Sequence, residues 1–152
     1  MRKRKLEIVH VSSPLRAAFA ISRGAKTHAD TVQVRLVEGE NAGRGECVPY
    51  ARFGETTASV MAAIESVRAA LEDGMDLAAL QDALPPGAAR CAVDCALWDL
   101  AAKQAGKPVW QLAGLPAPRP VETAVTISLA APDEMAEAAR TAPGKLLKLK
   151  LG

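Results

Sequence analysis

The feature that most constrains this sequence is its C-terminal strand–helix–strand pattern. Residues 121–129 alternate as a strand, and residues 145–151 alternate in the same way. Between them, Pro132 and two acidic residues mark the start of a helix that runs to about Arg140. Two strands joined by one helix lie parallel in a sheet, and a parallel sheet needs cover on both faces. The pattern therefore predicts the first unit of a parallel α/β domain, which we expect to continue beyond Gly152.

The last predicted strand carries two lysines, Lys148 and Lys150, spaced two residues apart. Side chains alternate along a strand, so both lysines leave one face, and Leu147, Leu149 and Leu151 leave the other. Two ammonium groups about 7 Å apart repel each other, and partial burial adds to this effect, so both factors lower a lysine pKa toward that of a usable base. The alternative is a half-solvated strand whose lysines simply face water. The local pattern leaves both interpretations open.

The opening 50 residues have the period of an antiparallel sheet. Strand-like alternation occurs in four stretches: 6–11, 19–22, 31–38 and 44–48. Loops are expected at three places: 12–18, 23–30 and 49–57. The glycine-flanked segment 39–43 has the composition of a hairpin turn. A three-stranded antiparallel meander is the predicted arrangement.

The middle of the chain switches to helical spacing. The predicted helices run from Thr56 or Thr57 to about Glu72, from Asp76 to Leu84, from Ala88 to Ala105, and for one turn over 109–112. Along the longest helix, Cys91, Cys95, Trp98 and Ala102 form one stripe, widened by Leu97 and Leu100. This stripe predicts that Cys91 and Cys95 are small buried residues rather than a disulfide. No nearby histidine completes a metal-ligand set with them.

Composition narrows the class of protein. The chain has 152 residues, of which 49% are hydrophobic, and a net charge of +2, which does not indicate nucleic-acid binding. No stretch has the length of a membrane span or the pattern of a secretory signal, so we expect a reduced, cytoplasmic setting. Three prolines within 116–120 predict a linker. The expected organisation is an α+β domain at 1–115, the linker, and the start of an α/β domain at 121–152.

Four segments in this order resemble one known family. They are Phe19–Gly24, Gly43–Tyr50 together with Arg52–Glu55, Asp94–Lys103, and Lys148-Leu149-Lys150. The chain is similar along nearly its whole length to the enolase superfamily and, within it, to the dipeptide epimerases of the muconate-lactonizing subgroup. The resemblance implies that the α+β part is a capping domain and that residues 121–152 begin a truncated TIM-type (β/α) barrel.

The resemblance also implies roles for particular residues. Lys150, the second lysine of the Lys-x-Lys pair, maps to one catalytic acid/base, and Lys148 maps to a position beside the substrate carboxylate. Thr126 maps to a substrate-contacting threonine, and Arg23 to an arginine that binds the distal carboxylate of the substrate. Loops near Arg23 and Phe53 would close over the site. On pattern alone, Arg23 is a solvated turn residue and Thr126 a packed strand residue.

The reaction implied by the resemblance is epimerisation of an Ala-Glu-type dipeptide with Mg²⁺ as cofactor. The acidic metal ligands and an opposing lysine are expected after Gly152, so no metal ligand is assigned, and the 152 residues alone are expected to be inactive. Two alternatives remain open: a muconate cycloisomerase or o-succinylbenzoate synthase, which share Lys-x-Lys, and a non-catalytic interaction module. Whether the complete protein forms a homo-oligomer is also open.

Overall fold

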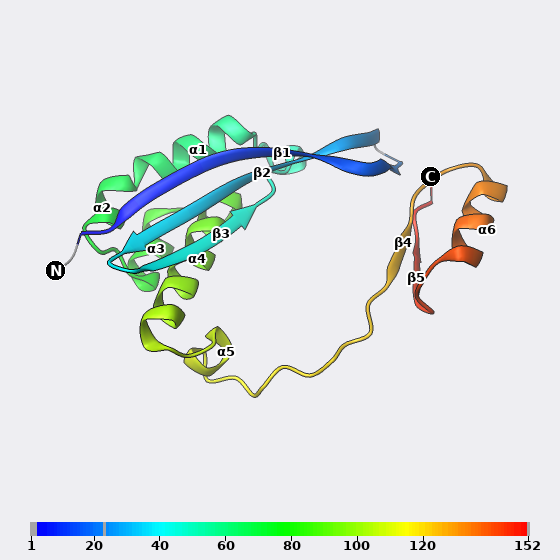
Figure 1. Cartoon of the computed structure of the whole chain (residues 1–152). Coiled ribbons are helices and arrows are strands. Elements are labelled where there is room, and N and C mark those ends of the chain that lie inside the picture. The colour runs from blue at the N-terminus through cyan, green and yellow to red at the C-terminus, as the bar shows by residue number, and fades with distance from the viewer. Residues whose placement is uncertain (1–2, 23, 152) are drawn as a thin grey trace. The chain divides into compact units, whose positions relative to one another are not determined.

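The computed structural model describes residues 3–22 and 24–151 (Figure 1). Arg23, one of the predicted substrate-binding residues, lies outside the described residues. Contacts divide the chain into two compact units, Met1–Ser12 with Asp30–Ala117 and Ser13–Ala29 with Pro118–Gly152. The predicted division at the 116–120 linker stays a prediction about independently folding domains.

A three-stranded sheet has the order β1 (Lys5–Ile21), β2 (Gly24–Glu38) and β3 (Asn41–Cys47). Its first-unit part is β3 with the portions of β1 and β2 outside Ser13–Ala29. Strands β2 and β3 are antiparallel, with Glu38 opposite Asn41, so Gly39 and Glu40 alone form the turn. Gly39 has a φ of 61°, the left-handed conformation that two-residue hairpins favour. The predicted hairpin and antiparallel sheet are confirmed.

The loops predicted at 12–18 and 23–30 are wrong. Strand β1 continues through Pro14 to Ile21, and β2 already begins at Gly24, so the two form one long hairpin (Figure 1). Strand β1 is the edge of its sheet, and an edge strand tolerates a proline because one side of its backbone needs no partner. The residues that indicated a strand break therefore lie where a break is unnecessary.

Helices α1 to α4 cover one face of this sheet (Figure 1). The helices of the unit are α1 (Thr57–Ser66), α2 (Arg68–Glu72), α3 (Leu77–Ala83), α4 (Ala88–Ala105) and α5 (Val109–Leu112). Thr56 and Ser59 cap α1 reciprocally, and the Asp76 carboxylate accepts the Ala79 N–H at the start of α3. The single helix predicted over 56–72 is interrupted at Val67, whose N–H donates to the Ile64 carbonyl in a tighter turn.

Helix α4 packs directly on β3, and two glycines make this possible. A Cβ at Gly43 would lie 2.6 Å from Leu100, and a Cβ at Gly45 would lie 2.8 Å from the Ala96 nitrogen. The buried face of α4 consists of Ala92, Val93, Ala96, Leu97, Leu100 and Ala102. The predicted burial of Cys91 and Cys95 is wrong, because both are exposed. The glycines of β3 select the alanine face of the helix for the sheet.

The second unit contains a parallel pair, β4 (Val125–Ile127) and β5 (Leu147–Leu149), connected through α6 (Pro132–Thr141). The predicted strand–helix–strand unit is confirmed, although both strands are shorter than the predicted 121–129 and 145–151. Ile127 is buried, whereas Leu149 is 51% exposed and Leu151 73% exposed. A parallel pair normally has neighbouring strands and covering helices, and among residues 3–22 and 24–151 no third strand pairs with β4 or β5.

Candidate functional site

Two of the predicted site residues face each other across the parallel strands. The register pairs Thr126 of β4 with Lys148 of β5, so their side chains leave the same face of the pair. Both side chains are exposed. Lys150 lies one residue beyond β5 and is half-buried, and its N–H donates to the Ile127 carbonyl at 3.0 Å, which continues the ladder. Thr126, Lys148 and Lys150 are thus held by one hydrogen-bonded ladder.

Within the second unit, Lys150 also contacts the outer part of the β1–β2 hairpin, which belongs to that unit. Its Nζ lies 6.0 Å from the centroid of the Phe19 ring, at the outer limit of a cation–π contact. Beside it, the Leu129 N–H donates to the Ala20 carbonyl at 3.1 Å. The hairpin therefore reaches the carboxyl ends of β4 and β5, the edge at which (β/α) barrels hold their catalytic groups. Phe19 lies in one of the segments that carry the family resemblance, but its sequence context predicts no role for it.

A second candidate segment is the loop of residues 50–55, within the loop predicted at 49–57. A short 3₁₀ turn, η1 (Ala51–Phe53), places the Tyr50 and Phe53 rings 5.6 Å apart, and Phe53 is 76% exposed. The loop borders a cavity of about 430 Å³ that reaches the start of α4 at Ala88. An aromatic pair with one exposed ring beside a cavity can contact an apolar group of a ligand.

The carboxylate of Asp99 has a structural rather than a catalytic role, because it joins α4 to β3 by a hydrogen bond. Its Oδ2 accepts hydrogen bonds from the Arg44 N–H at 2.8 Å and from Lys103 Nζ at 2.6 Å. Burial raises the pKa of Asp99, but these two hydrogen bonds more than offset it and hold the pKa below its usual value.

The described residues offer no ligand set for the Mg²⁺ that the resemblance implies. Within residues 3–22 and 24–151, no three His, Cys, Asp or Glu side chains gather closely enough to hold a metal ion. Burial raises the pKa of the Cys47 thiol to about 11, so this thiol stays protonated and is a poor ligand. Among the helices of the described part, none is long and apolar enough to cross a membrane.

The sequence matches known proteins of one family. The sequence model of the mandelate racemase / muconate lactonizing enzyme N-terminal domain matches residues 3–114. The L-Ala-D/L-Glu epimerase of Escherichia coli is 46% identical over 151 residues, covering 97% of this chain and 47% of that protein. The hydrophobic dipeptide epimerase of Roseobacter litoralis is 38% identical and is covered to 45%. The chain thus spans about half the length of the curated relatives it matches.

The solved structures to which this chain is similar also include dipeptide epimerases. An enolase family member from Agrobacterium tumefaciens with homology to dipeptide epimerases, with bound sodium and L-Ala-L-Glu, superposes with a TM-score of 0.91 at 47% identity. The match covers 98% of this chain and 46% of that one. A dipeptide epimerase from Cytophaga hutchinsonii, complexed with Mg and D-Ala-L-Val, gives a TM-score of 0.86 at 28% identity, covering 99% and 44% of the two chains.

Proposed function

Because the chain belongs to the mandelate racemase / muconate lactonizing enzyme family, we propose that it is the N-terminal part of a dipeptide epimerase that acts on Ala-Glu-type dipeptides. The observation that carries the proposal is the Thr126–Lys148 register pair with Lys150 directly beyond it. These residues lie outside the 3–114 family match, so they support the assignment separately from it.

In the proposed reaction, Lys150 Nζ takes the proton from the α-carbon beside the substrate carboxylate. Removal of that proton places negative charge on the carboxylate oxygens, and the Lys148 ammonium on the same strand offsets part of this charge. The Thr126 hydroxyl, opposite Lys148, contacts the substrate, and Arg23 binds its distal carboxylate.

The other half of the reaction needs groups that we assign to the rest of the complete enzyme. Inversion at carbon requires an acid on the opposite face of the substrate, and the two lysines occupy one face. A divalent cation such as Mg²⁺ supplies Lewis-acid stabilisation of carboxylate charge. Its ligands belong, in this proposal, to the portion of the relatives that this chain does not span.

The test measures solvent deuterium incorporation at the α-carbon of L-Ala-L-Glu and L-Ala-D-Glu by the complete protein. Lys150→Ala should abolish exchange from one epimer and leave the fold unchanged. Lys148→Ala should weaken substrate binding and slow both directions. Lys145→Ala removes an exposed lysine of the same segment and serves as the matched control. Undiminished exchange from both epimers in Lys150→Ala would remove this residue from the mechanism.

The nature of the distal group is tested with a second substrate. If Arg23 binds the side-chain carboxylate, Arg23→Ala should raise KM for Ala-Glu by at least tenfold and leave KM for Ala-Ala nearly unchanged. An equal effect on both dipeptides would assign Arg23 to loop structure and reopen the substrate class.

A further inference from the structure

The carboxylate of Glu55 attaches the loop of residues 50–55 to the helical layer. Glu55 Oε1 accepts the Ala88 N–H at 2.7 Å, and Glu55 Oε2 accepts the Tyr50 N–H at 3.0 Å. The two hydrogen bonds involve different oxygens and segments far apart in the sequence. Both are charge-assisted and partly buried, the class of hydrogen bond that contributes most to local order.

The start of α4 is adapted to receive this carboxylate. Gly87 is the N-cap residue and has no side chain to accept a free N–H of the first turn, so Glu55 takes that place from outside the helix. A negative charge at a helix N-terminus is also favoured by the helix dipole. A Cβ at Gly87 would lie 2.9 Å from Glu55 Oε1, so a glycine leaves the space the carboxylate occupies.

Two further hydrogen bonds of the loop are local to it. The Phe53 N–H donates to the Tyr50 carbonyl and the Gly54 N–H to the Ala51 carbonyl, which shapes the turn without attaching it to another element. Helix α4, in contrast, is held against β3 along its alanine face. Glu55 thus joins a locally folded turn to a rigid support.

We propose that Glu55 is a positioning residue that fixes loop 50–55, and with it the Tyr50–Phe53 aromatic pair, against the N-terminus of α4. The aromatic pair is then preformed before any ligand arrives. That this pair contacts the dipeptide rests on the proposed function, whereas the attachment of the loop does not.

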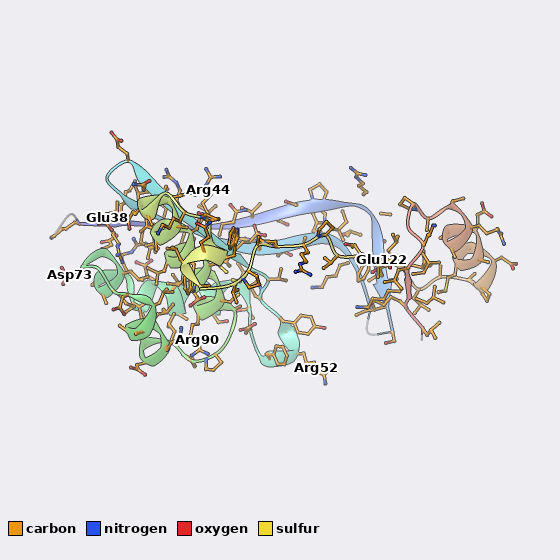
Figure 2. All side chains as sticks on the ribbon, turned by 90° about the horizontal axis from the view of Figure 1, so that it is seen from below. Glu38, Arg44, Arg52, Asp73, Arg90 and Glu122 are labelled. Atoms are coloured by element: carbon orange, nitrogen blue, oxygen red, sulfur yellow. The ribbon has the colours of Figure 1, made fainter. Side chains whose placement is uncertain are left out.

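The attachment is measured by trypsin cleavage after Arg52. This side chain is exposed and points outward from the turn (Figure 2). Glu55→Gln offers one acceptor and places an N–H group against the second donor, so it should break one of the two hydrogen bonds. We expect cleavage at Arg52 to be at least tenfold faster than in the unmodified chain, because cleavage follows the open population. Glu40→Gln, in the exposed β2–β3 turn, removes the same charge elsewhere and should leave the rate unchanged.

A second variant changes the contact without changing the charge. Gly87→Ala places a methyl group against Glu55 Oε1, the mobile end of its side chain, and should also accelerate cleavage at Arg52. If Glu55→Gln unfolds the whole domain, cleavage will appear at many sites. The rate of cleavage at Arg52 in Gly87→Ala then tests the proposal. Cleavage at Arg52 that is unchanged in a folded Glu55→Gln, or in Gly87→Ala, overturns the proposal.

In the complete enzyme, a loosened binding loop should raise KM for the dipeptide about tenfold or more while kcat changes less than threefold. A faster Arg52 cleavage with unchanged KM would retain the role of Glu55 in the loop and reject the contact of the loop with substrate. Absence of epimerase activity in the unmodified complete protein would reject the proposed function and leave the proteolysis result standing. Equal loss of kcat and kcat/KM would contradict positioning through binding.

Discussion

Replacing Gly45 by alanine should separate the two layers of the first unit. The added Cβ would meet the Ala92 carbonyl oxygen directly and lie 2.8 Å from the Ala96 nitrogen and 2.9 Å from the Ala92 carbonyl carbon. All three atoms belong to the backbone of α4, so no side-chain rotation relieves the overlap. Either α4 moves away from β3 or the strand bends.

The expected loss of stability depends on which atoms must move to accommodate the new methyl group. Adding a methyl group to a packed core costs about 1–3 kcal/mol when side chains can adjust. Here the obstacle is the hydrogen-bonded backbone of an 18-residue helix, so we expect the upper end, about 3 kcal/mol. With a urea m-value of about 1–3 kcal/mol per molar, the unfolding midpoint should fall by about 1–3 M.

The assay is urea unfolding followed by far-ultraviolet circular dichroism, with Trp98 and Trp110 fluorescence as a second probe. Arg44→Ala, the adjacent residue whose side chain leaves the opposite face of β3, is the matched control and should shift the midpoint by a few tenths of a molar. A Gly45→Ala midpoint within 0.3 M, roughly, of the unmodified chain would refute backbone contact between β3 and α4.

Three further predictions concern titration and activity. The pKa of Asp99 is depressed in the folded chain, so its stabilisation is complete above about pH 4 and is lost as pH falls through the folded value. Asp99→Asn should therefore shrink the difference between urea midpoints at about pH 6 and about pH 3; an unchanged difference contradicts this. Iodoacetamide at about pH 8 should modify Cys91 before Cys47, whose thiol has a pKa of about 11. The purified 152-residue chain should not epimerise Ala-Glu with added Mg²⁺; measurable turnover refutes it.

Much of the helical layer could be predicted because the residues that begin and end each helix lie next to it in the sequence. Helix α4 has the predicted bounds, Ala88 to Ala105, since Pro85-Pro86-Gly87 precedes it and Gly106 adopts a left-handed φ of 60° after it. The parallel pairing of β4 and β5 followed from the helix between them. In each case the decisive residues lie within the element or next to it.

The misjudged features depend on residues distant in sequence. The face of α4 that is buried is decided by Gly43 and Gly45 on another element, and helical periodicity alone equally allowed the cysteine face. Pro14 indicated a strand break, because a proline is tolerated only on an edge strand and the local sequence does not show which strand lies at the edge of the sheet. The role of Glu55 was missed because its partner Ala88 is 33 residues away.

The direction in which Lys148 and Lys150 point depends on the register of β5. In the observed register Thr126 faces Lys148, and a slip of one residue would place Leu149 there instead. Leu149 and Leu151 are exposed in this chain, so little opposes such a slip. In the complete barrel that we propose, helices cover the leucine face, and burying each leucine contributes about 1.5–3 kcal/mol to the correct register. Under this proposal, the helices that cover the leucines also hold Lys148 and Lys150 toward the site.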